Sequence, residues 1–260
     1  MQKEGKEAAS ETKFELTSNP NVMEGDGVKI VVSKDGPYVV SGNVPLNMQL
    51  ITPNKEGLSW EWELGKKFET GASYSLCRCG RSKNKPFCDG THAKIGFQGK
   101  ETATRRPYAR QAEIYPGPSL TLSDAEDLCA FARFCDPGGQ IWSLIEQKGE
   151  EARKLAIREA NYCPSGRLVL QDNKTGKAIE HRLPKSIGVV EDPALGCSGP
   201  LWVLGGIRVE SEDGRPYEVR NRVTLCRCGA SNNMPFCNGS HASIRFRDGL
   251  VEFVRVKENE

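Results

Sequence analysis

One cysteine-rich segment occurs twice in this chain of 260 residues. The first copy covers residues 76–97 and reads LCRCGRSKNKPFCDGTHAKIGF, and the second covers residues 225–246 and reads LCRCGASNNMPFCNGSHASIRF. The same offset separates every pair of equivalent positions, from Cys77 and Cys226 to Phe97 and Phe246. A duplication of this length at a fixed offset indicates two structurally equivalent units within one chain.

A weaker repeat precedes each cysteine segment. Residues 36–40 read GPYVV and residues 199–203 read GPLWV, each within a stretch of short apolar runs. Asp35-Gly36 and Asp213-Gly214 are turn signals between runs that are rich in strand-forming residues. The predicted strands are Lys29–Val32, Tyr38–Val40, Ile207–Glu210 and Tyr217–Thr224. Each unit is therefore expected to be a small β-rich module that ends in a cysteine loop.

The segment between the two repeats has a different pattern. Ser123-Asp124-Ala125-Glu126 is a capping box that predicts the start of a helix, and Pro137-Gly138-Gly139 would end that helix. A second, charged amphipathic helix is predicted over Glu150–Tyr162, before Cys163-Pro164. Residues at helical spacing in the first of these helices are Leu128, Phe131, Ala132 and Cys135.

The predicted fold class is α+β, with two small β-rich modules and a helical central insert. The polar N-terminal residues are expected to form a flexible tail. The expected parts are the tail at residues 1–20, the first module at 21–115, the insert at 116–190 and the second module at 191–260.

Composition narrows the setting in which such a chain works. A net charge of +2 gives no electrostatic case for a nucleic acid or membrane partner, and apolar runs such as Leu201–Leu204 are too short to span a bilayer. The N-terminal residues lack the apolar core of a secretory signal, so we expect a cytoplasmic protein. Ten cysteines in a reducing compartment point to metal or redox chemistry rather than disulfides.

Each cysteine segment offers three thiolates and one imidazole. In the first segment these are Cys77, Cys79, Cys88 and His92, and in the second they are Cys226, Cys228, Cys237 and His241. Such a set can hold structural zinc, although zinc sites usually separate paired cysteines by two to four residues. Two thiolates from Cys-x-Cys on one iron, with a cysteine and a histidine on a second iron, fit a [2Fe-2S] cluster more easily. The zinc alternative stays open at this point.

The two segments resemble the CDGSH iron–sulfur domain family, whose members include mitoNEET-like proteins. The resemblance is particularly to bacterial members that carry the motif twice. It implies two [2Fe-2S] clusters, with the first two cysteines of each motif on the inner iron and the third cysteine and histidine on the outer iron. It also implies that the two modules pair, here as an intrachain pseudo-dimer in a monomer. Asn238 departs from the family pattern, in which Asp89 is the matching residue of the first copy, but this position is not a ligand.

Four cysteines lie outside these segments. Cys129, Cys135 and Cys163-Pro164 resemble the ligands of a divergent ferredoxin-like family with a single cluster, in which a ligand cysteine often precedes proline. With Cys197 as fourth ligand the insert would hold a [4Fe-4S] cluster, and without it a [3Fe-4S] cluster or an open iron site. The alternative is that these cysteines only pack in the core.

The predicted function is electron transfer with a redox protein partner, either a reductase or a ferredoxin-like protein. Positive side chains near the first motif would suit an acidic partner, or they form a solvated face that balances the charge of an anionic cluster. The alternatives are a cluster donor to an apo-acceptor protein, a redox or pH sensor, or a structural zinc module. An enzyme is not expected, because the chain lacks a nucleotide-binding glycine motif and a catalytic triad pattern. The basic residues are Arg78, Arg81, Lys83, Lys85 and Lys94.

Overall fold

The computed structural model describes residues 16–17 and 27–252 of the chain. The tail predicted at residues 1–20 lies outside the described residues except for Leu16–Thr17, which form β1 and pair with β10 (Glu180–His181). Within the described residues, helices are too short or too polar to cross a membrane.

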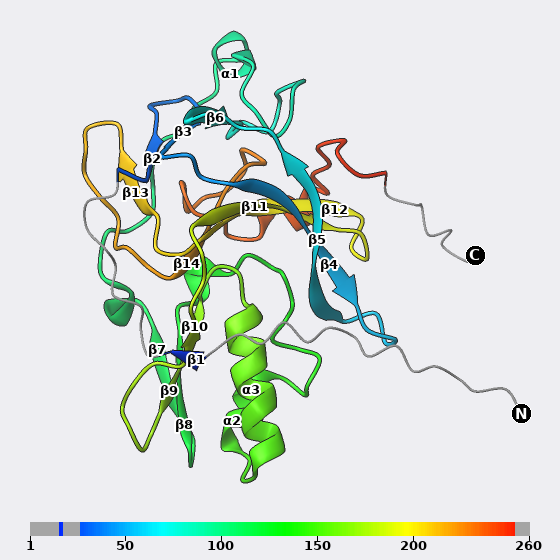
Figure 1. Ribbon diagram of the computed structural model, residues 1–260, viewed down its shortest axis with the longest axis vertical. Coiled ribbons are helices and arrows are strands. Elements are labelled where there is room, and N and C mark those ends of the chain that lie inside the picture. The colour runs from blue at the N-terminus through cyan, green and yellow to red at the C-terminus, as the bar shows by residue number, and fades with distance from the viewer. Residues whose placement is uncertain (1–15, 18–26, 253–260) are drawn as a thin grey trace, which may run out of the picture.

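Two β-sheets form the upper part of the molecule in Figure 1. The five-stranded sheet has the order β14-β12-β11-β4-β5, and the four-stranded sheet has the order β13-β2-β3-β6. The first sheet comprises β4 (Leu46–Pro53), β5 (Ser59–Phe68), β11 (Ser186–Asp192), β12 (Cys197–Leu204) and β14 (Arg222–Leu225). The second comprises β2 (Lys29–Val32), β3 (Tyr38–Ser41), β6 (Ser73–Leu76) and β13 (Arg208–Ser211).

The two halves of the chain exchange one strand each. The antiparallel pair β2–β3 in the first half is equivalent to β11–β12 in the second half. The next strand of each half then crosses over and joins the other half as a parallel strand. Leu46 on β4 lies opposite Ile187 on β11, and the equivalent Val209 on β13 lies opposite Ile30 on β2. This reciprocal exchange produces the expected pseudo-dimer of two β-rich modules within one chain.

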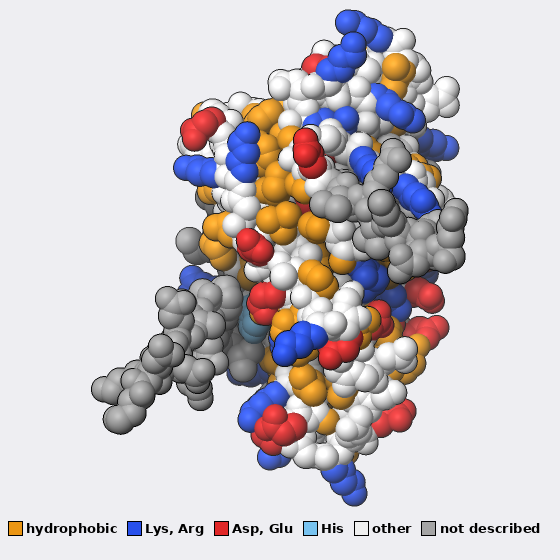
Figure 2. All heavy atoms as spheres, turned by 90° about the vertical axis from the view of Figure 1, so that its right-hand side faces the viewer, with side chains coloured by type: hydrophobic (Ala, Val, Ile, Leu, Met, Phe, Trp, Pro, Cys, Tyr) orange, Lys and Arg blue, Asp and Glu red, His pale blue; other side chains and the backbone are white. Residues whose placement is uncertain are grey.

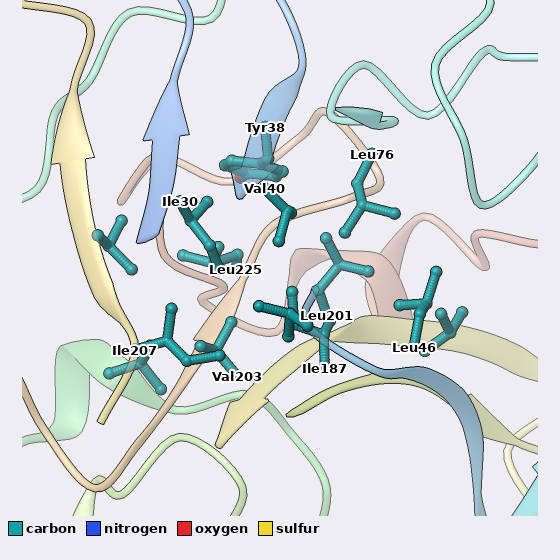
Figure 3. Packing of buried hydrophobic residues seen from close by; sticks show 14 of the residues in the cluster. Ile30, Tyr38, Val40, Leu46, Leu76, Ile187, Leu201, Val203, Ile207 and Leu225 are labelled. Carbon is teal, nitrogen blue, oxygen red and sulfur yellow. The ribbon is translucent and has the colours of Figure 1, made fainter. Parts of the chain in front are cut away.

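A single apolar core lies between the two sheets (Figure 3). Alternate residues of the strands point into it, as the period of two in a β-strand requires. Equivalent positions of the two halves meet there: Ile30 and Ile187, Val40 and Val203, and Leu76 and Leu225, all buried. Because both halves contribute the same positions to one core, neither half can bury its apolar face alone.

The hairpin predicted around Asp213-Gly214 forms at its turn: Ser211 N–H donates to Arg215 O and Tyr217 N–H donates to Val209 O, each at 2.9 Å. β13 forms nearly as predicted at Arg208–Ser211, but the predicted strand over Tyr217–Thr224 does not form as one strand, because β14 begins only at Arg222 and pairs with β12. The other edge of β13 bonds to β2 of the first half, a pairing that the sequence did not predict.

The insert lies below the two sheets in Figure 1 and contains both helices and strands. The predicted helix over Glu150–Tyr162 is confirmed as α3, and a shorter helix, α2 (Ile141–Glu146), packs beside it. Both helices cover a three-stranded antiparallel sheet that the sequence did not predict. Its strands are β7 (Glu113–Pro116), β8 (Leu120–Asp124) and β9 (Leu168–Asp172). β11 starts at Ser186, a few residues before the expected end of the insert at residue 190.

The helix predicted from Ser123 to Cys135 does not form. β8 continues to Asp124, a short 3-10 turn follows at Glu126–Leu128, and the chain then runs as an irregular loop. Phe131 and Arg133 have φ angles of 53° and 60°, values that no α-helix contains. The residues at helical spacing therefore lie on an irregular loop, and the two cysteines of this loop line a pocket.

Aromatic side chains attach this loop to the five-stranded sheet. The Trp62 ring lies 4.7 Å from the Phe134 ring and 4.4 Å from the Trp202 ring, between ring centroids. Arg133 also forms an ion pair of 2.5 Å with Asp192 at the end of β11. The insert is thus packed on the five-stranded sheet through residues of both halves, Trp62 on β5 and Trp202 and Asp192 on β12 and β11.

The two cysteine loops touch each other at two equivalent glycines. Gly80 and Gly229 have positive φ angles of 74° and 80°. A Cβ atom on Gly80 would lie 2.4 Å from the carbonyl oxygen of Cys228, and one on Gly229 would lie 2.6 Å from that of Cys79. Only glycine allows this approach of the two backbones.

We predict that Gly80→Ala destabilises the whole fold, because its methyl group would push the two loops apart. The free energy of unfolding should fall by about 3 kcal/mol or more, the sum of backbone strain and overpacking. The control is Gly214→Ala, where φ is 80° but a Cβ meets nothing within 4 Å among the described residues. It should cost only the strain of about 1 kcal/mol. Equal losses in urea unfolding of the two variants would contradict the prediction.

A second stability feature is the buried carboxyl group of Glu159 on α3. Its Oε1 accepts a hydrogen bond of 2.7 Å from Gly138 N–H, but Oε2 finds no partner among the described residues. Burial raises the pKa of Glu159 from 4.5 to about 7. The folded state therefore prefers the protonated acid, so this contribution to stability is complete below the unfolded pKa and is lost as pH rises through the folded pKa.

We predict that Glu159→Gln removes this pH dependence. Between about pH 4.5 and pH 8, the unfolding free energy of the wild type should fall relative to the variant by on the order of 2 kcal/mol. Urea unfolding at several pH values would measure it. Glu150→Gln, an exposed residue of the same helix, controls for the loss of one carboxylate. A difference between wild type and Glu159→Gln that stays constant with pH would count against the prediction.

Candidate metal centres

Each cysteine motif begins where the last strand of its module ends. β6 leads into Cys77 and β14 leads into Cys226. The N–H of Cys77 donates to the carbonyl of Pro86 at 2.9 Å, and the N–H of Cys226 donates to that of Pro235 at 2.8 Å. These bonds fold the loop back on the strand and bring the third cysteine near the first two.

One helical turn places the histidine of each motif. The turns are α1 (Thr91–Lys94) and α4 (Ser240–Ser243). His92 Nδ1 lies 3.3 Å from Cys88 Sγ, and His241 Nδ1 lies 3.4 Å from Cys237 Sγ. In both motifs the same ring nitrogen faces the third thiol, so cysteine and histidine can bind one metal ion together.

The first two cysteines of each motif form a second pair. Cys77 Sγ lies 3.9 Å from Cys79 Sγ, and Cys226 Sγ lies 3.6 Å from Cys228 Sγ. Within the described residues, His, Cys, Asp and Glu side chains do not gather in groups of three or more around one point. The donors of each motif thus come as two pairs, one of two cysteines and one of a cysteine and a histidine.

The two motifs differ in exposure at the outer pair. Cys88 and His92 are partly exposed, whereas Cys237 and His241 are 2% and 4% exposed. The insert covers the second motif: a Cβ on Gly239 would lie 3.1 Å from the Cβ of Phe131. The first motif is therefore the one that faces solvent.

Burial also fixes the charge state of His241. Desolvation, together with the nearby Arg227 guanidinium, lowers its pKa to about 4. The imidazole is then neutral at pH 7, which is the form that binds a metal ion.

The first motif lies in a positively charged part of the surface. Figure 2 shows Lys and Arg side chains at the end of the molecule where α1 lies. The prediction that Arg78 belongs to this surface is wrong, because Arg78 is 1% exposed and donates to backbone carbonyls inside the module. The basic face consists of Arg81, Lys83, Lys85 and Lys94, which are exposed or partly exposed.

Three of the remaining cysteines line one pocket in the insert. Cys129 and Cys135 come from the irregular loop, and Cys163 follows the end of α3. Burial and the neighbouring Asp136, Cys163 and Cys129 raise the pKa of the Cys135 thiol. The pocket thus joins two cysteines of one loop with Cys163, which is more distant in sequence, and Arg167 lines the same pocket.

Cys197 does not line this pocket. It starts β12, is 1% exposed, and has the carboxylate of Asp192 and the guanidinium of Arg133 as its electrostatic neighbours. Burial raises the pKa of its thiol to about 12. The structure separates Cys197 from the other three cysteines.

Arg222 connects the insert to the second motif, and the sequence analysis missed it. This buried side chain on β14 donates to the carbonyls of Cys163 and Ala160, each at 2.7 Å. It also forms an ion pair of 2.5 Å with Glu180. Arg222 thereby holds Cys163 close to β14, the strand that directly precedes Cys226. The sequence feature that could have indicated this role is a charged arginine in a strand whose other residues are uncharged.

Comparison with known proteins matches the two motifs and the insert to separate families. The family described as "Iron-binding zinc finger CDGSH type" matches residues 35–93 and 198–242. The family described as "Divergent 4Fe-4S mono-cluster" matches residues 115–173. No solved structure matches the chain.

Two curated relatives carry the same domain. The mouse "CDGSH iron-sulfur domain-containing protein 3, mitochondrial" is 36% identical over 57 residues, which cover 19% of this chain and 42% of the relative. The human protein of the same name is 33% identical over 58 residues, covering 20% and 46%. Each match spans less than half the length of the relative. The chain therefore contains two segments of the CDGSH iron–sulfur domain family, one on each side of a divergent 4Fe-4S segment, and these matches support an iron–sulfur protein.

Proposed function

We propose that this protein transfers electrons through three iron–sulfur centres in one chain. The first two are [2Fe-2S] clusters held by Cys77, Cys79, Cys88 and His92 and by Cys226, Cys228, Cys237 and His241. The third is a cluster in the insert. Bound iron–sulfur clusters supply one-electron redox chemistry that no side chain in the protein offers.

The observation that carries this proposal is the contact between neighbouring sites. The insert loop lies against the second motif, since the Gly239 Cβ position is 3.4 Å from the carbonyl oxygen of Cys129. The second motif in turn touches the first through Gly80 and Gly229. Three candidate centres in continuous contact suit a relay better than three independent carriers.

The residues of each motif fit a [2Fe-2S] cluster in number, chemistry and arrangement. Two thiols form the inner pair, and a thiol and an imidazole form the outer pair. The N–H groups of Gly90 and Gly239 point at the sulfur of the third cysteine, at 3.5 and 3.4 Å. Such N–H···S bonds stabilise an anionic thiolate ligand.

The insert offers three thiols to a third cluster. The other described residues that line its pocket are alanine, phenylalanine, proline, leucine and arginine, which do not bind iron. Cys129, Cys135 and Cys163 would then hold either a [3Fe-4S] cluster or a [4Fe-4S] cluster with one iron open to another ligand. Cys197 has no part in this assignment.

The partner we propose is an acidic redox protein, either a reductase or a ferredoxin-like carrier. It would dock at the basic face, next to the partly exposed Cys88 and His92. Opposite charges on the two surfaces would speed their association. We further propose a cytoplasmic monomer without catalytic activity, since reducing conditions keep its cysteines free for iron.

One observation favours a second function. The partly exposed outer pair of the first motif is accessible to an apo-acceptor protein, which suits a cluster donor. Incubation with an apo-ferredoxin separates the two functions. Cluster transfer within minutes would favour the donor, whereas electron exchange with retained iron would favour the carrier.

We predict about four irons per chain from the two motifs and three or four more from the insert, with matching acid-labile sulfide. Cys163→Ser should lose the iron of the insert and keep about four. Cys197→Ser is the matched control and should keep the wild-type content. Loss of the same iron from Cys197→Ser would refute the three-cysteine assignment, and a zinc protein without sulfide would refute the proposed function.

We also predict that reversing charge on the basic face slows electron transfer. In Lys83→Glu/Lys94→Glu, the second-order rate constant for exchange with an acidic [2Fe-2S] ferredoxin should fall about tenfold at low salt. The difference should shrink at high salt, where surface charges are screened. Lys174→Glu/Lys177→Glu, on a turn of the insert, serves as control. Equal rates in the two double variants, measured by stopped flow, would exclude docking at the basic face.

A further inference from the structure

One arginine occupies the same position in both motifs, between the first two cysteines. Arg78 and Arg227 are 1% and 3% exposed. Arg78 Nε donates to Gly36 O at 2.8 Å, and Arg227 Nε donates to the equivalent Gly199 O at 2.7 Å. Each module therefore buries one positive charge directly beside two cysteine ligands.

The two arginines differ in their counter-charges. Arg227 Nη2 lies 2.6 Å from Glu191 Oε1, and Arg227 Nη1 is ion-paired with Asp248. Arg78 Nη1 finds no hydrogen-bond partner in the part of the chain that the structure describes. The other two guanidinium nitrogens of Arg78 donate to neutral backbone carbonyls: Nε donates to Gly36 O and Nη2 donates to Ser33 O.

The sequence explains this difference. The positions of the first module that correspond to Glu191 and Asp248 hold Lys34 and Gly99. A Cβ on Gly99 would lie 2.4 Å from Arg78 Nη2, so the Arg78 guanidinium lies directly against a residue that has no side chain to pair with it. Both halves therefore contain the arginine, but the acidic residues at these two positions occur in the second half alone.

Asp248 provides a full negative charge. Burial raises the pKa of this carboxyl group, but Arg227 and the N–H of Leu250 lower it further, so the net shift is downward. Glu191 contributes less, because burial raises its pKa to about 7 in spite of Arg227. Arg227 thus has two carboxyl groups in direct contact with its guanidinium, whereas among the described residues Arg78 has none. The carboxylate of Asp35 lies nearby but accepts its hydrogen bond from Gly99 N–H.

We propose that the two motifs hold clusters of unequal reduction potential, with the first motif higher than the second. This inference rests on the proposed electron-transfer function. A single electron from a one-electron reductant would then reside at the first motif, beside the basic face. The electron would then remain on the cluster of the first motif, which faces solvent, until the partner binds.

Two physical effects act in the same direction. Reduction adds one negative charge to a cluster, and Arg78, which contacts no carboxyl group among the described residues, stabilises that charge through a medium of low dielectric constant. The second motif is covered by the insert and its outer pair is buried, so the added charge is less well solvated there.

One difference opposes this order. Asp89 in the first motif is replaced by Asn238 in the second, which places a carboxylate near the first centre. Asp89 is exposed, and its carboxylate accepts hydrogen bonds from the backbone N–H groups of Lys83 and Thr91. Water and salt screen an exposed charge much more than the buried Arg78. The buried arginine therefore sets the order.

The test is a potentiometric titration of the full-length holoprotein with dithionite and mediators, followed by EPR. We expect the two [2Fe-2S] signals to appear in separate one-electron steps. His92→Cys should move only the higher step to more negative potential, and His241→Cys only the lower step, because imidazole raises the potential relative to thiolate. Coincident steps, or the opposite assignment, would overturn the proposal.

The cause is tested with an isosteric variant. Asp248→Asn keeps the side-chain shape but leaves Arg227 less compensated, so the lower step should move toward the higher one. At a potential between the steps, the reduced fraction of the second centre relative to its oxidised form should rise roughly tenfold. Asp213→Asn, at an exposed turn, is the control and should leave both steps unchanged.

Glu191→Gln provides a second variant if Asp248→Asn does not retain iron, and it should shift the same step in the same direction. Unmoved steps in an iron-loaded variant would refute the role of the arginine environment. Iron and sulfide content separates this failure from that of the proposed function. A chain without two clusters would refute the function itself, whereas two clusters of equal potential would refute only the order.

Discussion

Two parallel strand pairings, β4 on β11 and β13 on β2, hold the halves of this chain in one fold. Without them, each half would keep a three-stranded sheet with its apolar face in water, which is barely sufficient for stability. The exchange buries both faces in a common core and presses the two cysteine loops together at Gly80 and Gly229. Each candidate centre therefore depends on strands from both halves, although its ligands come from one short segment.

Sequence reasoning succeeded where the determining contacts are local. The strand at Lys29–Val32, the helix at Glu150–Tyr162 and the approach of Cys88 to His92 all follow from neighbouring residues. It failed where partners are distant. A β-strand pattern such as that of residues 207–210 gives no information about a distant strand beside it, so the sequence predicted the turn at Asp213-Gly214 but not the pairing of β13 with β2. The loop at residues 125–135 was read as a helix because its apolar spacing fits both structures.

The candidate sites show the same difference between local contacts, which the sequence predicts, and distant contacts, which it does not. The spacing within each motif is local enough to account for the donor pairs that the structure shows, such as Cys77 with Cys79. The pocket of Cys129, Cys135 and Cys163 depends instead on how a loop and the end of α3 pack. Cys197 looked equivalent to these cysteines in sequence but lies by Asp192 and Arg133. Arg78 looked like a surface residue among other basic residues and is buried. Burial and long-range proximity are tertiary properties that spacing alone does not encode.

A duplicated pair of equal sites gives an electron no preferred direction. In this chain the segment inserted between the copies breaks that equality, because it covers only the second motif and is bonded to it through Arg222. The acidic partners of Arg227 add a second difference, and the basic face around the first motif adds a third. All three differences separate a buried, charge-compensated end from an exposed, positively charged one. The strand exchange keeps the loops of these unlike ends in contact at Gly80 and Gly229, as the proposed relay requires.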